Sequence, residues 1–181
     1  MHRILYRPVT KDDIDVVRSL AADIWREYYP AIITTEQIEY MLGLMYSPAV
    51  IGEELARGVR WELALDSAAH DHDRPVGFLS FEHDARARTI KLHKLYLVST
   101  LHGRGVGASM LEHVIAAAGS LDAETIWLQV NKRNARAIRS YERAGFAITG
   151  QAVVDIGGGF VMDDYVMARP LSRPRLDHRR R

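Results

Sequence analysis

Apolar and polar positions recur along the chain with two different periods, which predict a mixture of strands and helices. Segments with a two-residue period predict strands over 4–9, 61–65, 76–81, 89–98, 124–130, 146–155 and 160–168. Apolar residues three and four positions apart predict helices over 14–28, 38–45, 48–57, 106–118 and 134–144. One strand is therefore followed by two or three helices, three strands, a helix, a strand, a helix and two strands. This order is typical of the mixed α/β class.

Particular residues mark the ends of these segments. Thr10 and Asp13 have the spacing of a capping box, which satisfies backbone donors in the first turn of a helix. Pro48 suits the first position of a helix, and Gly145 stands where a helix ends on a left-handed residue. Pro8 predicts either that the first strand lies at an edge of the sheet or that the strand ends there, because the proline nitrogen has no hydrogen to donate.

The composition fits one domain and limits the classes of partner. The chain has 181 residues, of which 48% are hydrophobic and 26% charged, with a formal net charge of +1. We expect a single domain over 1–171 and a disordered basic tail over 172–181, because the tail has almost no apolar residues. The small net charge gives no basic field for nucleic acid. No apolar segment has the length of a membrane span or of a signal peptide, so we expect no membrane partner and a cytoplasmic location.

We expect no metal site. The chain has no cysteine, which excludes thiolate ligands and any mechanism that holds an acyl group on a protein thiol. A polar loop after the second strand contains His70, Asp71, His72 and Asp73, but their spacing fits no catalytic metal motif. Loop polarity alone explains this composition.

The segment 93–118 predicts an anion site. A buried strand leads into a turn with Gly103, Gly105 and Gly107, and an amphipathic helix follows. Such a turn leaves backbone N–H groups uncovered at the positive end of the helix dipole, where phosphate binds. The Lys-Ser/Thr pair of a Walker loop is absent. Gly103, Gly105 and Ala108 satisfy the loose dinucleotide fingerprint, but that fingerprint normally follows the first strand of a βαβ unit. A dinucleotide-dependent oxidoreductase is therefore a possible function of the chain, but it ranks third, behind the two functions described below.

Two motifs in a fixed order indicate which phosphate-bearing ligand the turn binds. The segment 102–107 follows Tyr96-Leu97 and has the sequence HGRGVG. The segment 134–146 carries its anchors at Asn134, Ala137, Tyr141, Gly145 and Phe146. Together they resemble the GNAT superfamily of acetyl-coenzyme A (acetyl-CoA)-dependent N-acetyltransferases, whose patterns are Gln/Arg-x-x-Gly-x-Gly/Ala and Asn-x-x-Ala-x-x-x-Tyr-x-x-x-Gly-Phe. His102 departs from the first pattern, which affects side-chain contacts to the cofactor rather than the backbone cradle.

The resemblance implies a fold and a cosubstrate. The fold is a mixed, mostly antiparallel central sheet of about six to seven strands flanked by helices. The cosubstrate is acetyl-CoA, with its pyrophosphate on the turn and its pantetheine arm paired with free backbone groups of the preceding strand. The resemblance assigns cofactor binding to Tyr96, Leu97, Val98, His102, Gly103, Arg104, Gly105, Val106, Gly107, Ala108, Asn134, Ala137 and Tyr141.

Acetyl transfer from a thioester to an amine needs a base, an oxyanion donor and an acid for the departing thiolate. Tyr141 matches the family position that often protonates the sulfur; the alternative is a helix tyrosine that only packs. The backbone N–H near Leu97 is the expected oxyanion donor. His93 has the strand parity of Leu95 and Leu97 and titrates in the useful range, which makes it one candidate base. Glu82 is the other, and a water chain is the alternative to both.

The acceptor amine is the least determined part. The segment 25–46 is rich in Tyr, Met and Ile, which either pack in the core or form the wall of a substrate pocket. Acidic residues of the first helices and the last hairpin would attract a cationic amine, unless they form a solvated surface: Glu27, Glu36, Glu39, Asp155, Asp163 and Asp164. We expect direct transfer, in a ternary complex, to a polyamine-like or amino-acid-like small molecule.

Two other functions stay open. One is acetylation of a protein or peptide N-terminus or lysine, and the other is a non-catalytic regulatory module that only binds coenzyme A. Retention of Tyr141 and of the glycine turn argues against the module. Many members of the family form homodimers, an arrangement that the residues of this chain neither require nor exclude.

Overall fold

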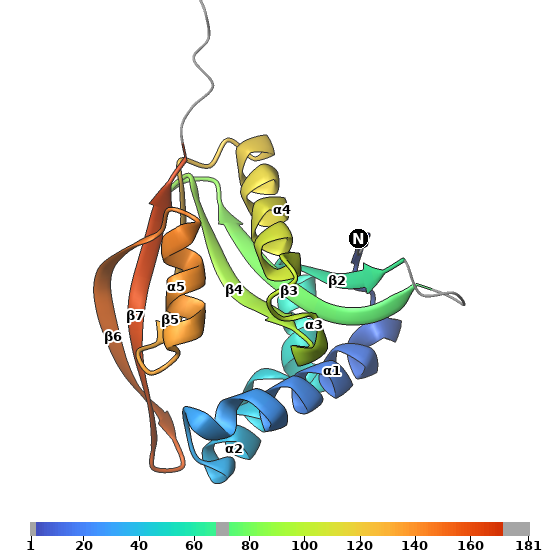
Figure 1. Ribbon diagram of the computed structural model, residues 1–181, viewed down its shortest axis with the longest axis vertical. Coiled ribbons are helices and arrows are strands. Elements are labelled where there is room, and N and C mark those ends of the chain that lie inside the picture. The colour runs from blue at the N-terminus through green and yellow to red at the C-terminus, as the bar shows by residue number, and fades with distance from the viewer. Residues whose placement is uncertain (1–2, 68–72, 172–181) are drawn as a thin grey trace, which may run out of the picture.

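A seven-stranded sheet with the strand order β1-β2-β3-β4-β5-β7-β6 organises the computed structural model (Figure 1). Its strands are β1 (Ile4–Pro8), β2 (Arg60–Asp66), β3 (Arg74–Asp84), β4 (Thr89–Leu97), β5 (Thr125–Asn131), β6 (Ala147–Gly157) and β7 (Phe160–Pro170). Among the strands that the structure describes, only β4 and β5 pair in parallel. The mostly antiparallel sheet predicted from the sequence is confirmed, and β1 lies at an edge as Pro8 indicates. The structure describes residues 3–67 and 73–171, so the tail 172–181 and three of the four loop residues, His70 to His72, lie outside them.

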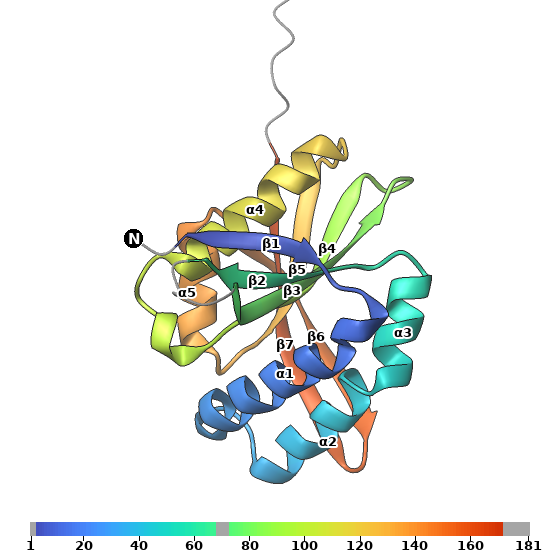
Figure 2. The same cartoon turned by 90° about the vertical axis from the view of Figure 1, so that its right-hand side faces the viewer.

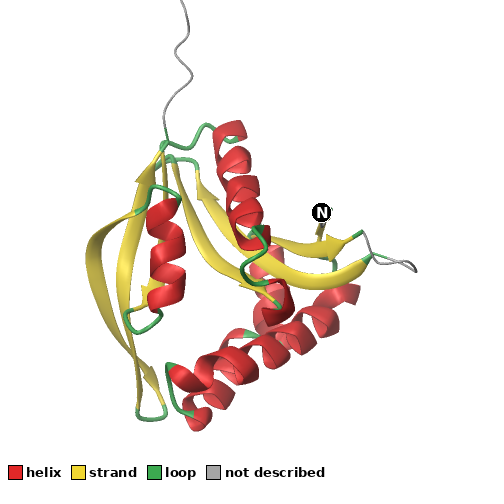
Figure 3. Cartoon of the chain, in the orientation of Figure 1, coloured by secondary structure: helices red, strands yellow, loops and turns green. Residues whose placement is uncertain are grey.

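Helices cover both faces of the sheet (Figures 1 and 2). On one face α4 (Val106–Ser120) and α5 (Ala135–Arg143) pack with β3, β4, β5 and β7 around one buried cluster. On the other face α1 (Ile14–Tyr28), α2 (Thr35–Met45) and α3 (Pro48–Ala56) form a second cluster with β2 and β3. Figure 3 shows α4 and α5 standing along the strands, away from α1 and α2. The helices predicted from periodicity are all present.

Caps begin these helices much as predicted. The Thr34 hydroxyl accepts a hydrogen bond from the Gln37 N–H at 3.2 Å, which satisfies a first-turn donor of α2. The capping box of Thr10 and Asp13 is also present, but it starts a short 3-10 turn, Lys11–Asp13, ahead of α1.

The parallel pair β4–β5 separates halfway along its length. Their pairing runs only as far as Leu92 opposite Leu128, although the strands continue to Leu97 and Asn131. Beyond that point β5 stays with β7, where Asn131 lies opposite Asp164. The sheet therefore opens into a gap between β4 and β5, with backbone groups that no neighbouring strand pairs.

A β-bulge at the start of this gap bends β4. Phe81 of β3 lies opposite Leu92 and Ser80 lies opposite Lys94, so His93 is an extra residue with no partner in the register. A bulge of this kind bends its strand and redirects the side chains that follow it. It therefore turns β4 away from β5.

The bulge corrects one sequence prediction. Leu95 and Leu97 pack with the α4 cluster, whereas Tyr96 packs with the α1–α3 cluster. His93 lies on the opposite face from Leu95 and Leu97, where it contacts Glu82. The prediction that His93 shares their parity is wrong, because strict alternation fails across the extra residue.

The last hairpin rests on α2. The Tyr40 hydroxyl donates a hydrogen bond to the Ile156 carbonyl at 2.6 Å, and the Gln37 side chain donates to the Val161 carbonyl at 3.0 Å. A Cβ on Gly158, which has a φ of 62°, would lie 2.9 Å from the Tyr40 ring. The glycines of the hairpin tip thus permit close contact with α2, and they bring the first helices and the last hairpin together beside the gap (Figure 1).

Candidate functional site

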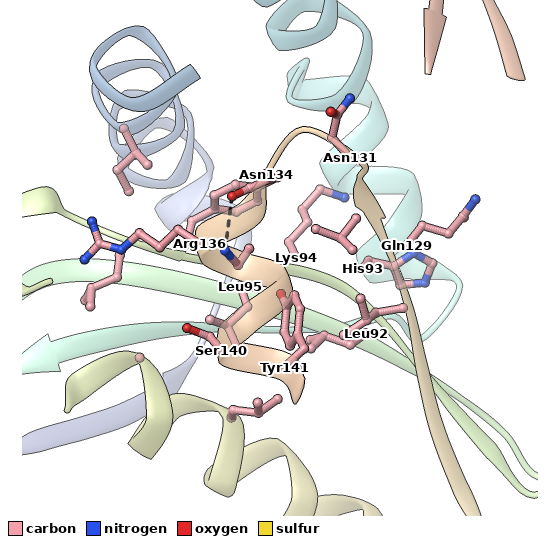
Figure 4. A pocket seen from close by; sticks show the side chains of 18 of the residues that line it. Leu92, His93, Lys94, Leu95, Gln129, Asn131, Asn134, Arg136, Ser140 and Tyr141 are labelled. Atoms are coloured by element: carbon pink, nitrogen blue, oxygen red, sulfur yellow. Dashed lines mark hydrogen bonds between the residues drawn. The ribbon is translucent and has the colours of Figure 1, made fainter. Parts of the chain in front are cut away.

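A cavity of about 1230 Å³ occupies the gap between β4 and β5. Its walls come from α4, α5 and the turn before α4 on one face, and from α1, α2 and β7 on the other. Figure 4 shows the side chains of β4, β5 and α5 that surround it. The volume exceeds the common range for a single small ligand, roughly 300–1,000 Å³. Two ligands, one from each face of the sheet, can therefore meet where the strands separate.

The glycine turn is shaped as an anion cradle. Gly103 and Gly105 have φ values of 75° and 81°, which favour glycine, and Gly105 begins α4 without a side-chain cap. The first turn of α4 contains no acidic residue. A Cβ on Gly103, Gly105 or Gly107 would meet no atom within 4 Å, so the backbone faces open space. Uncovered N–H groups at this helix end fit the pyrophosphate of coenzyme A.

His102 attaches this turn to the end of β4. Its Nε2 donates a hydrogen bond to the Leu97 carbonyl at 3.0 Å, and Tyr28 lies edge-on to its ring. The Val98 N–H donates to the Val76 carbonyl at 2.9 Å. The expectation of free backbone groups is therefore wrong for the Leu97 carbonyl and the Val98 N–H. Because antiparallel hydrogen bonds alternate along a strand, the Leu97 N–H points the other way, into the gap.

Asn134 connects the two sides of the gap. Its Oδ1 accepts a hydrogen bond from the Ala137 N–H at 3.2 Å, which caps α5, and another from the Tyr28 hydroxyl at 2.8 Å. The side chain is buried. Tyr28 was predicted as part of the helix 14–28 and of the aromatic segment 25–46, but its contact with Asn134, which lies 106 residues away, was not predicted. A contact between residues so far apart leaves no pattern in the neighbouring sequence from which it could be predicted.

We expect Tyr28→Phe to lower the free energy of unfolding by about 1 kcal/mol, because it removes one partly buried hydrogen bond but keeps the ring. Tyr165→Phe is the matched control, since the Tyr165 hydroxyl makes no hydrogen bond within 3–67 and 73–171. We expect the control to change stability by less than about 0.5 kcal/mol. Urea unfolding of both variants measures the difference, and equal stabilities would show that the Tyr28–Asn134 contact contributes nothing.

Tyr141 lines the cavity with a hydroxyl that keeps its proton. It lies on α5, partly buried, with its ring beside Phe146 and directed toward Leu92 and Leu95 (Figure 4). Burial raises the pKa of its hydroxyl to about 12, and the nearby Tyr28 adds to the shift. The group therefore stays protonated at neutral pH, so it can give a proton or a hydrogen bond but cannot act as a base.

His93 and Glu82 form a pair on the other face of β4. The His93 Nε2 lies 3.2 Å from a Glu82 carboxylate oxygen. Burial and the charges of Lys91 and Lys94 lower the pKa of His93, against the opposing effect of the Glu82 hydrogen bond. The imidazole is therefore neutral at physiological pH and can accept a proton. His93 lines the cavity beside Gln129, whereas Glu82 lies in a separate shallow hollow (Figure 4).

The wall on the α1–α2 side is aromatic. The rings of Trp25 and Tyr29 are stacked with centroids 4.4 Å apart, and Tyr96 lies against both. Met41 and Trp25 are buried in the core and also line the cavity. The segment 25–46 thus contributes to the core and also lines the cavity, and its role as the wall of a substrate pocket stays a prediction.

The six acidic residues suggested for the acceptor are dispersed. Among them, within the described part of the chain, only Asp164 lines the cavity. Glu39 pairs with Arg26, Asp163 pairs with Lys132, and Glu27 accepts a hydrogen bond from Ser99.

The structure gathers most of the residues predicted for cofactor binding. Those that line the cavity are Tyr96, Leu97, His102, Gly103, Gly105, Gly107, Ala108, Asn134, Ala137 and Tyr141. Val98, Arg104 and Val106 are not among the lining residues, and the side chain of Val106, the first residue of α4, is buried in the core. Over 3–67 and 73–171, no group of three or more His, Asp or Glu side chains could hold a metal ion. No helix in these residues is long and apolar enough to cross a membrane.

Comparison with known proteins identifies relatives over most of the chain. The model of the acetyltransferase (GNAT) family matches residues 19–146. An uncharacterized N-acetyltransferase of Mycobacterium tuberculosis is 33% identical over 88% of this chain and 98% of its own length. A peptidyl-lysine N-acetyltransferase of Escherichia coli is 32% identical over 57% of this chain and 63% of its own. The PaiA N-acetyltransferase of Thermoplasma acidophilum, solved with coenzyme A, has a TM-score of 0.76 at 20% identity, covering 93% of this chain and 99% of that one.

Proposed function

The chain belongs to the acetyltransferase (GNAT) family, and from this premise we propose that it transfers the acetyl group of acetyl-CoA directly to the primary amine of a small molecule. One observation carries the proposal: residues from both faces of the sheet line the cavity between β4 and β5. The glycine turn provides an anion cradle on one face, and the aromatic wall provides an acceptor pocket on the other. The two half-sites meet where β4 bends at His93.

Acetyl-CoA supplies an activated acyl group as a thioester; the residues around the gap hold it and move protons. The turn residues bind its pyrophosphate through their N–H groups. His93 accepts the proton of the attacking amine, and Glu82 holds the imidazole in position. The Leu97 N–H donates to the acyl oxygen as negative charge develops there, and Tyr141 donates its proton at the sulfur. No cysteine is available to carry the acetyl group, which supports direct transfer.

Two observations bear on the size of the acceptor. The contacts of Tyr40 and Gln37 hold the last hairpin beside the acceptor half of the cavity, which Gln37 and Met162 line, and this favours a small molecule. The similarity to a peptidyl-lysine N-acetyltransferase favours a protein lysine as the second candidate.

A panel of amines, amino acids and lysine peptides, assayed for thiol release with acetyl-CoA, discriminates between a small-molecule acceptor and a protein lysine. Mass spectrometry of the products should show an acetylated small amine; turnover of peptides alone would contradict the proposal.

We expect kcat at saturating substrates to fall as the pH drops through the lowered pKa of His93, because protonated imidazole cannot accept the amine proton. Glu82→Gln should move this acidic limb to lower pH, because it replaces the carboxylate that raises the His93 pKa with a neutral amide. His93→Gln should abolish the limb and lower kcat by about 100-fold. pH–rate profiles of the three proteins check this, and an unchanged profile in His93→Gln would place the base elsewhere.

A further inference from the structure

Asp164 is a buried carboxylate that the chemistry described so far does not use. Its residue is 4% exposed and lines the cavity. Within 3–67 and 73–171, its carboxylate makes no hydrogen bond and no ion pair. An unpaired buried charge is expensive unless a ligand completes it. Burial and the neighbouring charge of Asp163 raise its pKa to about 6, against the opposing effect of Lys132, so the group is still mostly ionised at neutral pH.

The strand alternation of β7 directs Asp164 to the acceptor half of the cavity. Met162, two residues before it, packs with the α1–α3 cluster, whereas Tyr165 packs with the α4 cluster. Asp163 points to the same side as Tyr165, where it pairs with Lys132 at 2.5 Å. Lys132, whose charge opposes the rise in the Asp164 pKa, is therefore engaged by Asp163 on the opposite face of the strand.

The other carboxylate of the acceptor half already has partners. Glu54 accepts a hydrogen bond from the Trp61 indole at 2.9 Å and pairs with Lys94 at 3.5 Å. Lys94 in turn lies 4.6 Å from the centre of the Trp61 ring. This arrangement satisfies both charges within the protein, so Asp164 is the carboxylate with capacity for a ligand.

Asp164 is displaced along the sheet from the reacting centre. His93 lies beside Gln129 in Figure 4, and Asp164 lies opposite Asn131. Asn131 is two residues further along β5, a rise of about 7 Å. One amine nitrogen cannot occupy both places. Aromatic rings of Trp25 and Tyr29 line the same half of the cavity and suit a methylene chain.

We infer that Asp164 binds a second positive charge on the acceptor, so that the enzyme selects diamines over monoamines of equal chain length. This inference rests on the proposed function and deepens it. The distal ammonium would form a charge-assisted hydrogen bond with Asp164 while the other nitrogen, deprotonated, reaches the base. Asp164 thus determines specificity without contacting the reacting atoms.

The test compares 1,4-diaminobutane with n-butylamine, which differs by lacking the distal ammonium. We expect Asp164→Asn to lower kcat/KM for the diamine by at least about tenfold, mainly through KM, and to change the value for the monoamine by less than twofold. Asp163→Asn is the matched control, because Asp163 lies on the same strand but faces the other way; it should change neither. A wild-type enzyme without preference for the diamine would overturn the inference, as would an equal loss for both amines in Asp164→Asn.

Calorimetry separates this inference from the proposed function. The wild-type protein saturated with coenzyme A should bind 1,4-diaminobutane more tightly than n-butylamine, and Asp164→Asn should lose the difference. That result supports the inference even without turnover. Absence of thiol release with every amine would overturn the proposed function, whereas diamine binding that is unaffected in Asp164→Asn would overturn the role of Asp164 alone.

Discussion

Gly107→Val is expected to weaken acetyl-CoA binding by at least about 100-fold, or roughly 2.7 kcal/mol, without unfolding the protein. Gly107 lies in the first turn of α4 with no atom within 4 Å of its would-be Cβ, so the fold itself has room for a side chain. Valine is no worse than glycine in a helix. The branched side chain would instead occupy the space in front of the N–H groups, where we propose that the pyrophosphate binds.

Gly107→Ala is the matched control for this substitution. The family pattern that the chain resembles accepts alanine at this position, so we expect near-normal binding and equal or higher thermal stability. Isothermal titration with coenzyme A gives the affinities, and melting curves without ligand verify folding. Unimpaired binding by Gly107→Val would show that the cofactor does not approach this turn.

Tyr141→Phe is expected to lower kcat by about 100-fold while the affinity for acetyl-CoA changes less than twofold. Phenylalanine keeps the ring against Phe146 but removes the hydroxyl, whose pKa of about 12 makes it a donor at every pH of interest. Stopped-flow thiol release measures the chemical step, and titration measures binding.

Glu142→Gln, on the exposed side of the same helix, is the control for the Tyr141 substitution and should leave both values unchanged. A normal kcat in Tyr141→Phe would assign the proton at sulfur to water or to another group. Equal losses in kcat and in affinity would indicate that the tyrosine only supports the pocket.

Local patterns in the sequence predicted the elements of this fold and one half of the site. Helices and strands follow from hydrophobic period, and the glycine turn with its helix predicts the anion cradle because its chemistry depends on neighbouring residues. The anchors from Asn134 to Phe146 fixed the place of Tyr141 in the same way. These features need no information from distant parts of the chain.

The parts that the sequence did not predict depend on pairing between distant segments. The bulge at His93 arises from the register of β4 against β3, which no local rule determines, and it reversed the expected face of the side chain. Tyr28 reaches Asn134 across the gap. Asp164 differs from the neighbouring acid Asp163 in its burial and in its lack of the Lys132 ion pair, and both differences depend on how the hairpin packs in the fold.

The central claim is that acetyl-CoA and an amine meet in the gap between β4 and β5, where the acetyl group passes directly to the amine. A single product analysis tests this claim most directly. The protein is incubated with isotopically labelled acetyl-CoA and a small-amine panel, and intact-protein and small-molecule mass spectra are recorded together. Labelled acetyl-amine should appear in a one-to-one ratio with free coenzyme A thiol, only when both substrates are present, and the protein mass should stay unchanged. Labelled acetyl on the protein before amine is added, or no acetyl-amine from any member of the panel, would contradict direct transfer.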